Sequence, residues 1–389
     1  MTANTDGLVI KNGRVLLDNG RLEVRDVLVA GGIIRDVGVG LNATSQIDAA
    51  GSYVLPGLID LHTHGIGFVR NEAGNLAEYA ALEAARGTTT FYPTFFNPPA
   101  RMAEQMERHR RESDELRKCP NVGGFRLEGP YLARTGAGSV ESLASITPEN
   151  TQLMLKAGGG HIKIWDVSPE LPGAAELIRQ LTGASIVCSI CHTQATVEQA
   201  RAAVDAGARL VTHMFDTFVL PEMTDPGVYP AGLTDYLLTE DAVTCEIIAD
   251  GTHVHPILVE EAFRCKTPER IAFVTDSNMG AGLPPGEYTL PSTFGHVVVR
   301  GSNDGVRLRD RGMLLAGSAL TPIDAFRNAI ELFHKDVATA SRVCSTTQAR
   351  LLGLNKGEIA VGKDADLIIL DTQFQVLRTI VAGKTIYQK

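Results

Sequence analysis

The middle of the chain, residues 56–349, alternates apolar strand-like runs with helix-like runs. The strand-like runs are TTTFYPTF, GFRLEG, HIKIWDV, SIVCSICH, RLVTHMF, TCEIIAD and RIAFVTD, and a segment ending in HTHG precedes them. Helix-like pieces such as VEQARAAVDAGA and PILVEEAFRC lie between them. Apolar strands that alternate with helices are typical of a parallel sheet covered by helices. A total of about eight strands favours a closed (β/α)8 barrel over an open sheet.

Both ends of the chain have a different character and are rich in short β-like runs. The first segment contains Asn12-Gly13 and Asn19-Gly20, which are hairpin turn signals. The last segment, GEIAVGKDADLIILDTQFQVLRTIVAGKTIYQK, has the pattern of about three or four short strands with a turn near Gly383. We therefore predict that residues 1–55 and 350–389 together build a small β-sandwich, and that residues 56–349 form the barrel as an insertion.

Polar side chains follow nearly every strand-like run of the barrel. A single His or Asp at a strand end is more often a cap or an ordinary hydrogen bonder. In a barrel, however, the carboxyl ends of all strands meet at one mouth, so the whole set is expected to converge there. The residues of this set are His62, His64, Glu128, His192, His213, Asp250 with His253, and Asp276.

The residue types in this set are those of a metal site. His62 and His64 are two apart in a strand, so both imidazoles lie on one face. A buried Glu128 needs a partner, because an unpaired carboxylate is costly to desolvate. Zinc accepts such mixed nitrogen and oxygen ligands and keeps a position open for water. Asp276, at the end of a late strand, is the candidate general base and acid.

Two other motifs offer alternative chemistry. Lys163, in HIKIWD, is a candidate carbamylated lysine that bridges two metals, although Glu128 is the preferred bridging or sole carboxylate. Cys188-Ser-Ile-Cys191-His192 matches the C-x-x-C-H pattern of haem attachment, and C-x-x-C alone can be redox-active. Haem attachment implies export, and the N-terminal residues lack the basic start and apolar core of an export signal.

Composition excludes several classes of partner. The net charge is −9 and no long basic run occurs, so a nucleic-acid partner is not expected. No apolar run approaches the ~20 residues of a membrane helix. The six cysteines are scattered, which indicates reduced thiols and a cytoplasmic protein. The segment 101–117 carries charges of both signs and is expected to be a solvated outer helix face.

The chain also resembles the N-acetylglucosamine-6-phosphate deacetylases of the amidohydrolase superfamily. The motifs occur in the family's order over nearly the whole length. They are PGLIDLHTHG (56–65), LEGPYL (127–132), CHTQAT (191–196, similar to the family's GHSNAT), VTHMF (211–215), IIADGTHVHP (247–256), VTDSNMGAGLPPGEY (274–288), LAGSALTPIDAFRNA (315–329) and GEIAVGKDADLIIL (357–370).

The resemblance implies a (β/α)8 barrel with a β-sandwich made from both termini, and an enzyme that hydrolyses an acetyl amide on an amino sugar. It implies a divalent metal, zinc first and iron or manganese as alternatives, with one or two ions per chain. It also implies a homodimer whose partner completes the site. The implied roles are Glu128, His192 and His213 for the main metal, His62 and His64 for a second, Asp276 for acid–base catalysis, His253 for the sugar, and Ala316 and Gly317 for the acyl group.

The stretch that would recognise a sugar phosphate departs from the family. Asp216-Thr217 stands where the family has Asn-Ala, and no Arg occurs between Arg209 and Arg264. Gly138 stands where a substrate-contacting His is expected, and Arg134 is the candidate that compensates. A carboxylate at position 216 repels a phosphate dianion. The alternative expectation is therefore an N-acyl or cyclic amide substrate without a phosphate.

Overall fold

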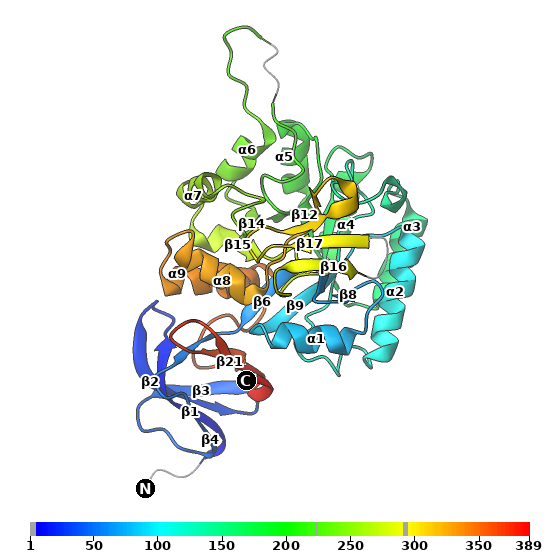
Figure 1. Ribbon diagram of the computed structural model, residues 1–389. Helices are drawn as coiled ribbons and strands as arrows, with labels where there is room; N and C mark the ends of the chain where they lie inside the picture. The colour runs from blue at the N-terminus through cyan, green and yellow to red at the C-terminus, as the bar shows by residue number, and fades with distance from the viewer. Residues whose placement is uncertain (1–4, 222–224, 291–294) are drawn as a thin grey trace.

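The computed structural model describes residues 5–221, 225–290 and 295–389. A barrel surrounded by helices forms one body, and a smaller sheet that contains both chain ends lies beside it (Figure 1). Within the described residues, no helix has both the length and the apolar character that crossing a membrane requires.

The barrel is a sheet of eight parallel strands whose spatial order follows the chain. The predicted (β/α)8 fold is confirmed. A parallel bridge between Thr63 and Ser277 and a hydrogen bond from Asp276 N–H to the His62 carbonyl (2.8 Å) connect the last strand to the first. The strands are β6 (Leu58–Thr63), β9 (Thr88–Phe95), β10 (Phe125–Leu127), β11 (Ile162–Val167), β12 (Val187–Ile190), β13 (Leu210–Val211), β14 (Thr244–Ile248) and β15 (Ile271–Val274).

Helices cover the outside of the barrel (Figure 1). They are α1 (Leu76–Ala84), α2 (Pro99–Glu112), α3 (Pro148–Gly158), α4 (Ala174–Gly183), α5 (Val197–Ala206), α6 (Leu233–Thr239), α7 (Pro256–Cys265), α8 (Pro322–Glu331), α9 (Val337–Ser341) and α10 (Thr347–Leu351), with a π-helical turn over Arg342–Thr346. The expected helix face 101–117 is shorter than predicted. It ends at Glu112 because Asp114, Glu115 and Leu116, which follow the C-cap Ser113, have left-handed backbone.

Both chain ends together build one small β domain, as predicted, and its strands belong to a single eight-stranded sheet. Its strands are β1 (Thr5–Leu16), β2 (Leu22–Ala30), β3 (Ile33–Gly38), β4 (Ala43–Asp48), β5 (Tyr53–Pro56), β20 (Leu367–Leu370), β21 (Val376–Val381) and β22 (Lys384–Gln388). The antiparallel pair β5–β20 joins the N-terminal half to the C-terminal half. Val27, Val54, Leu367 and Ile380 belong to one apolar cluster, so both halves bury the same core. The domain boundaries at residues 55/56 and 349/350 stay a prediction.

One of the two predicted hairpin turns is wrong. Asn19-Gly20 does connect β1 to β2, but β1 continues through Asn12-Gly13. Asn12 has φ 56°, and the pairing with β2 shifts between Ile10 and Gly13, so this dipeptide forms a β-bulge. A Cβ on Gly13 would lie 2.4 Å from a Val54 methyl, which explains the need for glycine there.

A further antiparallel sheet of four strands lies between β15 and α8 and was not predicted. Val297, Val299 and Val306 pack in it against Met279 and Ala316, which attach it to the loops at the barrel mouth. Its strands are β16 (Gly286–Leu290), β17 (Gly295–Val299), β18 (Val306–Leu308) and β19 (Leu314–Leu315); a small hairpin, β7 (Gly65–Ile66) with β8 (Val69–Arg70), follows β6.

A buried carboxyl group of α1 predicts that stability falls as pH rises. Glu83 is 0% exposed and accepts one hydrogen bond, from Thr88 Oγ1 (2.9 Å). Burial, with Asp60 nearby, raises the pKa of Glu83 to about 8 from an ordinary 4.5. Between these values the folded chain binds more protons than the unfolded chain, so stability declines with rising pH. Each unit of the pKa difference corresponds to about 1.4 kcal/mol of folding free energy that ionisation of Glu83 removes. Because glutamine has no such charge, Glu83→Gln should unfold at a higher temperature than the parent at pH 8.

Thermal unfolding at several pH values between 4.5 and 8 checks this expectation. The two proteins should unfold at similar temperatures at the acid end of the range. If the difference between the two unfolding temperatures is the same at every pH in this range, the assigned role of Glu83 is wrong.

Candidate metal centre

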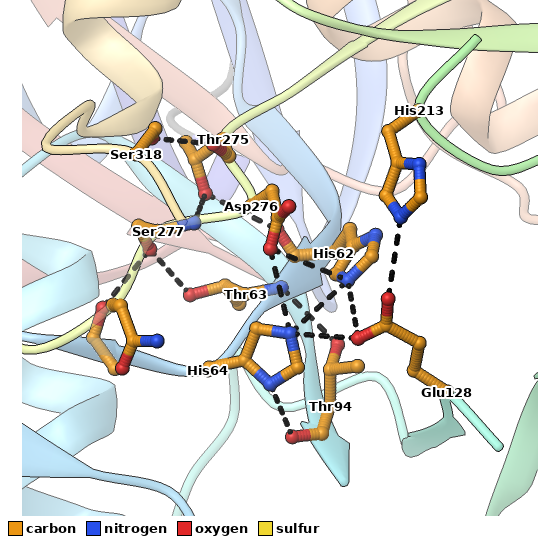
Figure 2. Close-up of polar contacts among 12 residues, drawn as sticks. His62, Thr63, His64, Thr94, Glu128, His213, Thr275, Asp276, Ser277 and Ser318 are labelled. Carbon is orange, nitrogen blue, oxygen red and sulfur yellow. Dashed lines mark hydrogen bonds and ion pairs between the residues drawn. The ribbon is translucent and has the colours of Figure 1, made fainter. Parts of the chain in front are cut away.

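Six side chains from the carboxyl ends of barrel strands lie together, with the carboxylate of Glu128 between the histidines. Figure 2 labels all of them except His192. His62 and His64 belong to the end of β6, and Glu128 directly follows β10. His192, His213 and Asp276 each lie two residues beyond their strands, β12, β13 and β15. The predicted convergence at the barrel mouth is therefore present in the structure.

The two oxygens of Glu128 face two different pairs of imidazoles. Oε2 lies 3.2 Å from His62 Nε2 and 2.9 Å from His64 Nε2. Oε1 lies 3.0 Å from His192 Nε2 and 3.3 Å from His213 Nε2. The carboxylate thus stands between two half-sites, each with two imidazole nitrogens and one carboxylate oxygen.

Asp276 lies beside the half-site of His62 and His64. Its Oδ1 is 3.5 Å from His62 Nε2 and 3.4 Å from His64 Nε2. Burial favours the neutral acid, but His62 and His64 outweigh it and lower the pKa of Asp276 to about 2. Asp276 is therefore an ionised carboxylate that can accept a proton.

Two of the imidazoles are oriented by backbone carbonyls. His64 Nδ1–H donates to the Thr94 carbonyl (3.2 Å), and His192 Nδ1–H donates to the Arg134 carbonyl (3.1 Å). This tautomer leaves the Nε2 lone pair free and directed toward Glu128. Such a hydrogen bond on the outer nitrogen is the usual support of a metal-ligating histidine.

The backbone at three strand ends is unusual in a way that places the side chains. His192, His213 and Asp276 have φ values of 45°, 27° and 45°. Non-glycine residues seldom adopt this left-handed region, at a cost of ~1–3 kcal/mol each. Asp276 is held there on both sides, because its N–H donates to the His62 carbonyl and its carbonyl accepts from Ser318 N–H (both 2.8 Å).

The charges of the cluster fit a cation at its centre. Burial opposes protonation of His64 and His213, yet the surrounding carboxylates raise the pKa of both to about 10. Burial also opposes ionisation of Glu128, but the histidines hold its pKa well below the usual range. The carboxylates therefore require positive charge, which a divalent ion supplies while the imidazoles stay neutral. Within each of two groups the ligand atoms lie within 4.8 Å of one another: Glu128, Cys191, His192 and His213; and His62, His64 and Glu128.

The two alternative motifs do not provide the chemistry considered for them. Lys163 lies at the start of β11, the opposite end from the metal centre, and its Nζ donates to the Gly160 carbonyl (3.0 Å). The thiol of Cys188 points to the Ile178 carbonyl (3.8 Å) of α4, whereas Cys191 faces the metal ligands. The two thiols lie on opposite sides of the strand and cannot share a haem.

The predicted substrate residues surround this centre. His253 Nδ1 pairs with Asp250 Oδ2 (2.6 Å), and the charge of Asp216 contributes to the raised pKa values of both His213 and His253. Arg134 Nη1 donates to the Thr217 carbonyl (3.2 Å), which ties two substrate candidates together.

Gly138, Gly317 and Ala316 are small residues that allow neighbouring groups to pack closely beside the metal centre. A Cβ on Gly138 would lie 2.2 Å from the Phe96 ring, which packs near the His192 ring with centroids 6.0 Å apart. A Cβ on Gly317 would lie 2.7 Å from the Asp276 carbonyl, and the adjacent Ala316 is buried. The roles of these residues in substrate binding stay predictions.

Sequence reasoning missed a buried charge network next to the ligands. Arg126 is 0% exposed, and its guanidinium donates to both oxygens of Asp166 (3.1 Å each) and to Glu246 Oε1 (2.6 Å). Burial opposes ionisation of Glu246, but Arg126 outweighs it and holds the pKa of Glu246 below its usual value. Alternation along β10 is the signal that could have placed Arg126 inside, because it is two residues before Glu128.

Comparison with known proteins identifies the family. The model of the amidohydrolase family matches residues 53–386. N-acetylglucosamine-6-phosphate deacetylase of Lysinibacillus sphaericus is 30% identical over 97% of both chains. N-acetylgalactosamine-6-phosphate deacetylase of Escherichia coli O157:H7 is 29% identical over 97% of this chain and 98% of its own.

Solved structures agree with the sequence relatives. An alanine variant of the Mycobacterium smegmatis N-acetyl-D-glucosamine-6-phosphate deacetylase, in complex with N-acetyl-D-glucosamine-6-phosphate, has a TM-score of 0.86 at 28% identity and covers 98% of this chain and 100% of that one. The Thermotoga maritima N-acetylglucosamine-6-phosphate deacetylase has a TM-score of 0.84 at 26% identity with the same coverage. The chain therefore belongs to the amidohydrolase family.

Proposed function

We propose that this protein is a metal-dependent amidohydrolase that removes the acetyl group from an N-acetylated amino sugar. The observation that carries the proposal is the placement of the Asp276 carboxylate beside His62 and His64, two of the four imidazoles that face Glu128. The names of the relatives, N-acetylglucosamine- and N-acetylgalactosamine-6-phosphate deacetylases, support this reaction and substrate class.

The metal ligands are proposed as two sets that share Glu128. Glu128, His192 and His213 hold the main ion, with zinc as the first candidate and iron or manganese as alternatives. His62 and His64, together with Glu128, would hold a second ion. A divalent cation there supplies Lewis acidity for an amide carbonyl and for water.

The protein groups then move the proton and position the sugar. Asp276 accepts the proton of the attacking water and returns it to the amine nitrogen as the amide bond breaks. We assign His253, whose Nδ1 pairs with Asp250, the role of hydrogen-bonding a sugar hydroxyl. Ala316 and Gly317 line the space for the acetyl methyl group.

Charge at the mouth favours a second candidate, an N-acyl substrate without a phosphate. Residues 210–263, which include the ligand His213, contain no Arg and no Lys. Asp216 lies near enough to His213 and His253 to raise the pKa of both. A carboxylate in this position repels a phosphate dianion, whereas Arg134 is the group available nearby to attract one.

Steady-state kinetics on matched substrates test both candidates. We expect release of acetate from N-acetylglucosamine and N-acetylgalactosamine, with kcat/KM at least equal to that for the 6-phosphates. Asp216→Asn removes the repulsive charge, and the ratio of kcat/KM values should shift toward the phosphorylated sugar by about tenfold, the equivalent of about 1.4 kcal/mol.

The outcomes separate the candidates. A clear preference of the parent protein for the 6-phosphates would leave deacetylation intact and remove the second candidate. Failure to release acetate from any of the four sugars, together with hydrolysis of a cyclic amide or an N-acyl amino acid, would replace the sugar as the substrate class.

We also propose a homodimer in the cytoplasm. The described parts of the connection between β13 and α6, residues 212–221 and 225–232, extend away from the barrel (Figure 1). On it, the side chains of Leu220 and Tyr229 are 81% and 91% exposed, as expected for a surface that a second copy covers. All six cysteines are free thiols, which is consistent with a reducing compartment.

A further inference from the structure

His62 differs from the other imidazoles of the centre because its outer nitrogen faces a carboxylate. His62 Nδ1 lies 3.7 Å from Glu246 Oε2. Both residues are 0% exposed, and neither atom has a hydrogen-bond partner among the described residues. Two buried polar atoms that face each other without a partner are rare, because each loses its hydration on folding.

The position of Glu246 is fixed from the other side. Its Oε1 accepts from Arg126 Nη1 (2.6 Å), and the same nitrogen donates to the Leu61 carbonyl (3.1 Å). The rest of the guanidinium is occupied by Asp166 and by Thr212 Oγ1 (2.9 Å). Asp166 already provides a two-oxygen partner for Arg126, so the second oxygen of Glu246 remains directed at His62.

We infer that Glu246 is a positioning residue that holds His62 with Nε2 directed at the second half-site. A neutral imidazole that binds a metal through Nε2 has its proton on Nδ1. Only this tautomer can donate to Glu246 Oε2. The separation of 3.7 Å is longer than a hydrogen bond of ~2.7–3.2 Å, so a movement of His62 by less than about 1 Å closes it. The inference rests on the proposed second metal ion.

The substitution Glu246→Gln tests the role because the side chain keeps its size, while the group that faces His62 changes from an acceptor to a donor. Arg126 has only donors, so the amide oxygen of Gln must face Arg126. The amide NH2 group then faces His62 Nδ1 and favours the tautomer with its proton on Nε2, which cannot bind a metal. Loss of such an outer support lowers metal affinity by about 10–100-fold.

The measurement is zinc content and zinc affinity of the purified full chain in chelator-buffered zinc. The parent should bind two ions, and Glu246→Gln should bind the second at least about tenfold more weakly while it retains the first. Asp166→Asn is the matched control, because it removes the other buried carboxylate on Arg126 without facing an imidazole. The affinity of Asp166→Asn for the second ion should be within about twofold of that of the parent.

The outcomes are distinguishable. If the parent binds two ions and Glu246→Gln binds both with unchanged affinity, the positioning role is wrong and the proposed metal centre stands. If the parent itself binds fewer than two ions, the proposed second site fails and the role of Glu246 fails with it. An equal loss of affinity for the second ion in Glu246→Gln and Asp166→Asn would assign the effect to Arg126 and overturn the inference.

A measurement on the unsubstituted protein covers the case in which Glu246→Gln does not fold. With 15N-labelled histidine and zinc bound, His62 should give a slowly exchanging Nδ1–H resonance that is shifted downfield by the carboxylate. The resonance is assigned by its loss in His62→Asn. Its absence from the zinc-loaded parent would contradict the hydrogen bond to Glu246.

Discussion

Replacing Asp276 with asparagine is expected to lower kcat by about 10³-fold while the metal content stays unchanged. The carboxylate lies 3.4 Å and 3.5 Å from the Nε2 atoms of His64 and His62, the nitrogen pair that faces Oε2 of Glu128. Its pKa of about 2 keeps it ionised, which is the form that a general base requires. An asparagine amide has nearly the same shape but cannot accept and return that proton. Acetate release under saturating N-acetylhexosamine, with metal analysis of the same sample, checks the prediction.

Two results would contradict this role. Turnover close to that of the parent would remove Asp276 from the mechanism. Parallel loss of metal and turnover would make Asp276 a ligand instead of the acid–base group. An unfolding temperature close to the parent's is the required control, because the Asp276 backbone also connects β15 to His62 and Ser318 through hydrogen bonds.

The barrel and the convergence of its strand ends were predictable because both follow from local pattern. Continuous apolar runs separated by helices indicate parallel strands, and parallel strands deliver their carboxyl ends to one mouth. Alternation places His62 and His64 on one face without knowledge of the rest of the chain. The strand position of Lys163 also held usable information, because a residue at the start of a strand lies at the opposite end from the mouth.

Other features depend on contacts that local pattern does not contain. Alternation could place Arg126 inside the barrel, but its partner Glu246 is 120 positions away, and local pattern does not pair the two residues. The Asn12-Gly13 bulge uses a dipeptide that favours hairpin turns, and only the approach of Val54 distinguishes the two outcomes. The strands of β16–β19 are at most five residues long, so they carry little periodic signal.

The left-handed backbone at the metal-centre residues is another feature that local sequence pattern does not predict. Glycine or asparagine is the usual sequence signal for positive φ, yet His192, His213 and Asp276 adopt it without that signal. Their conformation is imposed by hydrogen bonds and packing at the mouth. Strained non-glycine residues of this kind are concentrated at functional sites, where the surrounding fold supports them.

Glu128→Gln is expected to have the broadest effect on the metal centre, because one side chain serves both half-sites. Each carboxylate oxygen lies within 3.3 Å of two imidazole nitrogens. A carboxamide has one acceptor oxygen and must turn its NH2 group toward the other pair. We expect at most one zinc ion per chain, and a fall in kcat/KM of at least ~10³-fold, the equivalent of several kcal/mol of lost charge stabilisation. Metal analysis and acetate release measure the two effects.

Comparing the metal content of Glu128→Gln with that of His64→Gln distinguishes a ligand of both ions from a ligand of one ion. His64 faces only Oε2 of Glu128, so its loss should weaken the second ion and leave the ion of His192 and His213 in place. If Glu128→Gln, like His64→Gln, loses only the second ion and binds the first with the affinity of the parent, Glu128 does not bridge the half-sites and instead belongs to one of them. If Glu128→Gln retains two ions at unchanged affinity, the carboxylate is not a ligand, since a neutral amide cannot replace a bridging anion between two dications.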